Sequence, residues 1–286
     1  MMSLHALLVA PFETLDFMRA ALVACIALAL TNGAVGTLLL LRRMSLDGDV
    51  LGHAVMPGAA IGFLYGGPSP TWLSIGGLVS GLAVGMLAAL VARRRGRDDT
   101  GLVAFYLIAL SLGVLLVTWR GSNVDVVRVL FGTVLAIDQR SLLQIAATTS
   151  VILLLLAALY RPFAVGSFDP EFLRAVSGRI PYRGLFTGLV VLALVSSFQA
   201  FGTLLAVGPM LLPAAAAQCW GCSVAGSMVL AILFALFACV AGLLVSYHAN
   251  LPSGPAVVLL AGCLYGVSLL ASGVGRHVSA RMGRST

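Results

Sequence analysis

The sequence predicts an all-α fold, a polytopic membrane helical bundle of eight to nine transmembrane helices. Hydrophobic residues make up 60% of the 286 residues and charged residues only 9%, and the mean hydropathy is +1.07. A soluble globular protein carries roughly a quarter charged residues. Apolar runs of about 20 residues, the length of a membrane span, recur from one end of the chain to the other. Residues 1–286 therefore form a single membrane domain in this interpretation.

Nine segments are long and apolar enough to be candidate spans. The weakest is 203–218, because Pro209 and Pro213 interrupt it, although a bundle can satisfy the backbone groups that proline frees. Eight spans is therefore the alternative count. The first run has no basic residues before it and is too long for a signal peptide, so we expect it to stay in the membrane. The candidate spans are 17–41, 50–66, 70–92, 101–118, 142–161, 184–200, 203–218, 224–246 and 255–274.

The arginines orient these spans. The net charge is +7, and all 17 basic residues are arginine. With nine spans and the N-terminus outside, thirteen arginines fall on the cytoplasmic side and four on the outer side. Cytoplasmic loops collect positive charge, so this bias predicts an external N-terminus and a cytoplasmic C-terminus. The basic charge then indicates membrane topology and not a nucleic-acid partner.

Two loops are longer than a simple turn. The outer loop 119–140 contains "VDVVRVLFGTVLAID", which is too short for a span and suggests a helix lying on the surface. The cytoplasmic loop 162–183 reads "PFAVGSFDPEFLRAVSGRIPYR". Ser167 or Asp169 could cap a short helix there, and Glu171 suits its positive N-terminal end. This amphipathic helix would offer three apolar side chains to a partner, namely Phe168, Phe172 and Leu173.

Glycine is abundant, with 32 residues, and part of it is regularly spaced. A small residue at every fourth position lets two membrane helices approach closely. We therefore expect these glycines to serve helix packing. They are Gly58, Gly62 and Gly66 in one segment and Gly77, Gly81 and Gly85 in the next.

The stretch "RRMSLDGDVLGHAVMPG", residues 42–58, places polar groups where a membrane helix should begin. Asp49 and His53 are four residues apart, so a helix starting near Asp49 presents both on one face. A carboxylate and an imidazole are suitable ligands for zinc, manganese or iron. The alternative is structural: Asp49 caps the helix and His53 fills a polar gap. A pair near a charged helix end is shallow for a transport site, so we further hypothesise that "MSLDGD" enters the bundle as broken helix.

Other features carry less chemistry. His248 in "SYHANLPSGP" is a candidate gate ligand or an ordinary histidine at the outer surface. Cys219 and Cys222 form "CWGC" without a second such pair, which favours a packing or turn feature over a metal site. Phosphate-loop, HExxH and GxSxG motifs are absent from the sequence, so we expect no catalytic residues and no enzyme activity in this chain.

Three patches in this order are typical of one family: "LLRRMSLDGDVLGHAVMPG", "SFDPEFLRAVSG", and the pair "VGPMLLPAAAA" with "SYHANLPSGPAVVLL". They resemble the membrane permease subunits of bacterial ATP-binding-cassette importers for zinc, manganese and iron. The resemblance runs from about Phe17 to Leu270. It implies a multi-pass permease in the bacterial plasma (inner) membrane, with Asp49 and His53 at the positions of the family's metal-contacting residues. One departure is Asn250, where the family often has aspartate.

The resemblance also implies partners. A second permease copy would complete a homodimer in the lipid bilayer, an ATP-binding-cassette ATPase subunit would dock on the cytoplasmic side, and an extracytoplasmic metal-binding protein would deliver the ion. The loop with Phe168, Asp169, Glu171 and Phe172 would be the coupling helix that the ATPase receives. The transported divalent metal would be zinc first, with manganese or iron as alternatives, and no cofactor would be bound permanently. The rival function is a secondary transporter coupled to protons or sodium, with Asp49 as its coupling carboxylate.

Overall fold

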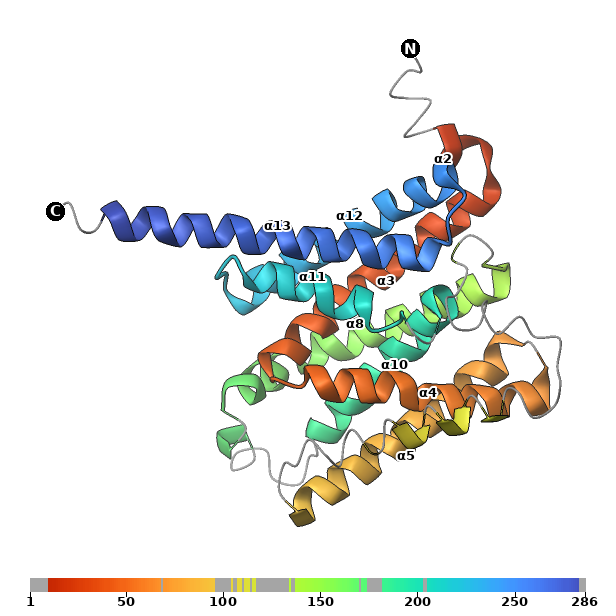
Figure 1. Cartoon of the computed structure of the whole chain (residues 1–286). Coiled ribbons are helices and arrows are strands. Elements are labelled where there is room, and N and C mark those ends of the chain that lie inside the picture. The colour runs from red at the N-terminus through yellow and green to blue at the C-terminus, as the bar shows by residue number, and fades with distance from the viewer. Residues whose placement is uncertain are drawn as a thin grey trace.

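A computed structural model describes most of the chain as a bundle of long helices (Figure 1). All the regular structure in the described residues is helical, as predicted. Six helices are long and apolar enough to cross a membrane: α3 (Asp16–Leu41), α5 (Pro70–Arg95, over Pro70–Leu87), α8 (Gln139–Phe168), α10 (Tyr182–Phe201), α12 (Val224–Ala249) and α13 (Ser253–Met282, over Ser253–Ser272). The described residues are 10–67, 69–95, 104, 107–109, 111–113, 115–116, 134, 137–169, 171–173, 182–202 and 205–282.

The predicted count of eight to nine spans is not confirmed. Helix α4 (Ser45–Gly66) has 22 residues and is long enough to cross, but it is less apolar than the six. Helix α11 (Gly208–Gln218) has 11 residues, about 16 Å at 1.5 Å per residue, which is too short to cross a core about 30 Å thick. The expected spans 101–118 and 203–218 and the expected surface helix in 119–140 lie partly or mostly outside the described residues.

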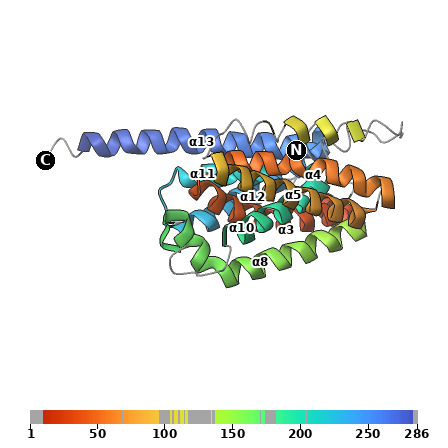
Figure 2. The same cartoon turned by 90° about the horizontal axis from the view of Figure 1, so that it is seen from below.

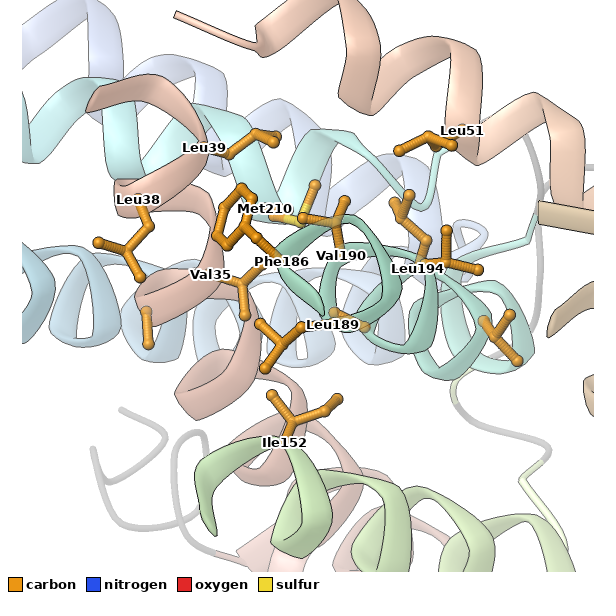
Figure 3. Close-up of a cluster of buried hydrophobic side chains, with 14 of the residues drawn as sticks. Val35, Leu38, Leu39, Leu51, Ile152, Phe186, Leu189, Val190, Leu194 and Met210 are labelled. Atoms are coloured by element: carbon orange, nitrogen blue, oxygen red, sulfur yellow. The ribbon is translucent and has the colours of Figure 1, made fainter. Parts of the chain in front are cut away.

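Helices α3 and α10 form the centre of the bundle, and they are the most buried of the six candidate spans. In Figure 2, α8 and α13 lie on opposite faces with α3, α10 and α12 between them. Figure 3 shows the main apolar core, where side chains from α3, α4, α8, α10 and α11 meet. Its labelled members are Val35, Leu38, Leu39, Leu51, Ile152, Phe186, Leu189, Val190, Leu194 and Met210.

The spaced glycines bring α4 and α5 into backbone contact, as predicted. A Cβ at Gly58 would overlap the carbonyl of Gly76, and a Cβ at Gly62 would overlap the carbonyl of Trp72. In the second series, a Cβ at Gly77 would lie 2.7 Å from Val55 Cγ1 on α4, whereas the atoms nearest to a Cβ at Gly81 or Gly85 belong to α10. Small residues therefore set the short distance between α4 and its neighbour.

The turn from α3 to α4 is short and fully hydrogen-bonded. Arg43 has a left-handed backbone (φ 55°), its N–H donates to the carbonyl of Leu40 at 2.9 Å, and the N–H of Met44 donates to that of Leu39 at 3.0 Å. This is the Schellman arrangement that ends many helices. Helix α4 then begins at Ser45, and its start is fixed relative to the end of α3.

Helix α8 is longer than the expected span 142–161. It begins after Asp138, whose carboxylate accepts a hydrogen bond from the N–H of Ser141 at 3.1 Å, and it continues through Pro162 to Phe168. The sequence analysis placed the start of the cytoplasmic loop at residue 162. This is wrong, because the helix continues for about two more turns. Proline is tolerated inside membrane helices when neighbours support the freed backbone. The carbonyl that Pro162 leaves without its helical partner is that of Ala158, four residues before it. Just after the proline, the guanidinium of Arg42 donates to the carbonyl of Phe163.

Candidate metal site

Helix α4 places Asp49 and His53 one turn apart on the same face, as their spacing predicted. Oδ1 of Asp49 lies 3.8 Å from Nε2 of His53. The two side chains differ in burial, because 53% of the aspartate side chain is exposed and only 8% of the histidine side chain. The carboxylate therefore points out of this chain while the imidazole is packed within it.

The helix that carries this pair is continuous, so the expected broken helix at "MSLDGD" is wrong. Asp49 and His53 lie about 6 and 12 Å along the axis from Ser45. Two glycines of this stretch approach their neighbours closely: a Cβ at Gly48 would lie 2.7 Å from Leu39 Cδ2, and one at Gly52 would lie 2.6 Å from Val207 Cγ2. Glycine thus lets α4 pack directly against α3 and the segment before α11.

The pair supplies one oxygen and one nitrogen donor. Ligand bonds of about 2.1 Å place two ligands of one ion about 3 to 3.5 Å apart, so a small side-chain rotation from the observed 3.8 Å brings both atoms within reach of an ion. Among the described residues, no group of three or more His, Cys, Asp and Glu side chains could hold a metal. The described part of this chain therefore offers two candidate ligands, and a complete metal site would need further donors.

The secondary candidates remain apart from this pair. His248, in the last turn of α12, is exposed, and its Nδ1 lies 2.8 Å from the carbonyl of Leu244. Cys219 and Cys222 flank a turn after α11 that includes Gly221 with φ 63°. Neither thiol forms a disulfide, and each donates a hydrogen bond to a nearby backbone carbonyl. The turn interpretation of "CWGC" is confirmed.

The residues expected to meet the ATPase lie at the end of α8. We call Phe168, Asp169 and 171–173 the coupling segment. Oδ1 of Asp169 accepts a hydrogen bond from the N–H of Phe172 at 2.9 Å, so Asp169 caps the turn that follows. Glu171 is exposed, and so are Phe168 and Phe172, at 70% and 56%. Residues 174–181 of the expected helix are outside the described part of the chain.

Sequence reasoning missed the role of Arg42, which it used only as a topology marker. Its Nη2 donates to the carbonyl of Phe163 at 3.0 Å, and its Nε donates to Oγ of Ser167 at 3.3 Å. Its guanidinium carbon lies 3.9 Å from the ring centroid of Phe186. Burial, with a smaller contribution from the charge of Arg183, lowers the pKa of Arg42 to about 10. Arg42 is therefore still charged at neutral pH while it ties α3 to α8 and α10.

Buried polar pairs between helices were also missed. Oγ of Ser197 on α10 donates to Oδ1 of Asn32 on α3 at 3.0 Å, and Gln199 donates to Ser74 on α5. Polar side chains inside apolar runs were the available signal, because such residues usually face the interior of a bundle. The hydrogen-bond partner of each such side chain could not be predicted from a single sequence, because it lies on another helix.

The long apolar helices, with a carboxylate–imidazole pair on α4, and the family match that follows place this protein in the class of membrane transport components. The chain belongs to the ABC 3 transport family, whose profile matches residues 14–272. It is 32% identical to the manganese import system permease protein ScaB of Streptococcus parasanguinis, over 90% of this chain and 91% of that protein. It is 30% identical to the manganese transport system membrane protein MntC of Listeria monocytogenes, over 89% and 90%.

The fold agrees with a solved structure. The complex described as PsaBC from Streptococcus pneumoniae with Fab contains a chain that matches this one with a TM-score of 0.83 and 29% identity. The match covers 92% of this chain and 94% of that chain. The resemblance seen in the sequence motifs is thereby confirmed at the level of the family.

Proposed function

We propose that this chain is the permease subunit of an ATP-driven manganese importer, and that Asp49 and His53 bind the ion during its passage. The observation that carries the proposal is the Asp49–His53 pair within the helical bundle of an ABC 3 family member. Similar permeases are named for manganese import or transport. The expectation of zinc first has no support from these relatives, so manganese takes its place.

The donor chemistry agrees with manganese. Carboxylate oxygen and water suit this ion, and imidazole binds many divalent transition metals. No described cysteine joins Asp49 and His53 in a group of three, so the soft thiolate ligand that would favour zinc or copper(I) is not part of the described site.

A second copy of the chain is the natural source of further ligands. A half-exposed carboxylate on a membrane helix is expensive against lipid and requires protein or water around it. The face of α4 that carries Asp49 also exposes Leu46 (58%), three residues before it. Two copies packed through this end of α4 would bring two Asp49–His53 pairs towards one axis and cover Leu46.

The remaining partners follow from the coupling segment and the topology. The exposed Phe168 and Phe172 would dock on an ATPase subunit, and an extracytoplasmic metal-binding protein would supply the ion at the opposite end. Arg42 contacts Phe163 and Ser167, so the end of α3 and the end of α8 lie together. This supports the orientation inferred from arginine, with both ends cytoplasmic, the N-terminus outside, and the protein in the bacterial inner membrane.

The test is reconstitution of the chain in proteoliposomes with and without its ATPase and binding protein. We expect accumulation of radioactive manganese that requires ATP and all three proteins, and that excess manganese suppresses more strongly than excess zinc. Uptake by this chain alone, driven by a proton or sodium gradient, would contradict the proposal and favour a secondary transporter. If excess zinc suppresses manganese accumulation more strongly than excess manganese does, the choice of metal is wrong, but the ATP-driven importer remains supported.

A further inference from the structure

The side chain of Arg42 joins three helices at the cytoplasmic end of the bundle. Two of its nitrogens hydrogen-bond the last turns of α8, at the carbonyl of Phe163 and at Oγ of Ser167. Its guanidinium stacks on the ring of Phe186, in the first turns of α10, at 3.9 Å. A planar guanidinium can make several such contacts at once, and a lysine ammonium cannot reproduce them.

The coupling segment lies against the same turn of α8. Ser167 is followed at once by Phe168 and Asp169. Leu173 packs on Gly166, where an added Cβ would lie 2.6 Å from Leu173 Cδ2 and 3.4 Å from Nη2 of Arg42. A shift of the coupling segment therefore reaches Arg42 through one packed turn, without a flexible linker between them.

On its other side, Arg42 is the residue that ends α3 and leads into α4. The left-handed Arg43 and the hydrogen bond from Met44 to Leu39 hold this turn, and α4 begins directly after it. Asp49 is only seven residues beyond Arg42, within the first turns of a continuous helix. One hydrogen-bonded turn thus joins Arg42 to the helix that carries the candidate metal ligands.

We propose that Arg42 is a positioning residue that transmits movement of the coupling segment to the start of α4, and so links ATP hydrolysis to the state of the Asp49–His53 pair; this inference rests on the proposed function. Packed helices that are joined by hydrogen bonds can switch between a small number of discrete arrangements. The charge of Arg42, which persists at neutral pH, maintains both hydrogen bonds and the ring contact through the cycle.

The experiment measures manganese transported per ATP hydrolysed, in proteoliposomes containing the full complex. The variants are Arg42→Gln, which removes the charge, and Arg42→Lys, which keeps the charge and loses the planar guanidinium with its several N–H donors. Arg161→Gln is the matched control, because this arginine also lies near the end of α8 but is exposed. If Arg42→Gln does not accumulate, Phe186→Leu takes its place, since it removes the ring contact and keeps an apolar side chain.

We expect manganese transported per ATP to fall at least about fivefold in both Arg42 variants, the lower end of typical coupling between sites. Manganese binding and co-purification with the ATPase should stay at wild-type levels, and Arg161→Gln should behave as wild type. An unchanged ratio in Arg42→Gln, or full rescue by Arg42→Lys, would overturn the inference. A wild-type complex that hydrolyses ATP and moves no manganese would instead overturn the proposed function.

Discussion

Asp49 and His53 lie one helical turn apart on α4, with Oδ1 of the aspartate 3.8 Å from Nε2 of the histidine. The exposed carboxylate and the buried imidazole differ in what surrounds them. We infer that His53 is held in place by packing, whereas the Asp49 carboxylate is free to meet groups outside the described part of this chain. A two-ligand site of this kind binds weakly unless other donors complete it.

Replacing either ligand should abolish most manganese uptake. We expect Asp49→Ala and His53→Ala each to reduce uptake by the complete importer about 10- to 100-fold, the range that even supporting residues of metal sites show. Asp47→Asn is the matched control, because Asp47 lies in the first turn of α4 on a different face. Uptake of radioactive manganese in cells lacking other importers gives the measurement. Normal uptake by Asp49→Ala at normal protein levels would remove Asp49 from the site.

The cap at Asp169 should matter for coupling through its hydrogen bond. Asp169→Ala loses the bond to the N–H of Phe172, and loss of such a cap costs about 0.5–2 kcal/mol of local helix stability. We therefore expect Asp169→Ala to weaken ATPase binding and metal-stimulated ATP hydrolysis. Asp169→Asn caps equally well and should keep both. Equal losses in the two variants would mean that the charge of Asp169, and not its cap, is needed.

The contact between α4 and α5 should be intolerant of any added side chain. At Gly58 a Cβ would overlap the carbonyl of Gly76, so we expect Gly58→Ala to destabilise the detergent-solubilised protein by about 1–3 kcal/mol. Gly262→Ala is the control, because a Cβ there meets no atom within 4 Å and alanine favours the helix. Thermal unfolding compares the two. Equal melting temperatures for both variants would contradict the observed backbone contact.

Asn250 should act through its backbone. It ends α12 in the left-handed region, with φ 51°, and Oγ of Ser246 donates to the carbonyl of Leu251 beside it at 2.6 Å. Asn250→Ala should therefore cost about 1–2 kcal/mol, and Asn250→Gly should be tolerated. Thermal unfolding checks the order. We expect manganese uptake to be normal in Asn250→Gly, and a loss of uptake without a loss of stability would assign the amide a role in transport.

The sequence predicted local features well. The Asp49–His53 pair depends only on the period of one helix, and the contact made by Gly58 and Gly62 depends on a regular spacing. The cap at Asp169 was one of two alternatives, and the structure decided between them. Each of these features lies within one helix or between two consecutive helices, so neighbouring residues were sufficient to indicate it.

The features that the sequence missed depend on tertiary contacts. Arg42 meets Phe163 and Ser167, which follow it by 121 and 125 residues, and an arginine at the end of an apolar run otherwise looks like a topology signal. Helix α8 also continues through Pro162 to Phe168, where a loop was expected. In the segment 203–218 the prolines were noticed, but hydropathy alone suggested a full span where α11 is a short helix.

The metal assignment is tested most directly by pulsed electron paramagnetic resonance of Mn²⁺ bound to the purified complex. If His53 binds the ion, the electron spin echo will show modulation from a directly coordinated imidazole nitrogen. His53→Ala should lose this modulation, and His248→Ala should keep it. Nitrogen modulation that persists in His53→Ala, with manganese bound as tightly as in the wild type, would contradict the site.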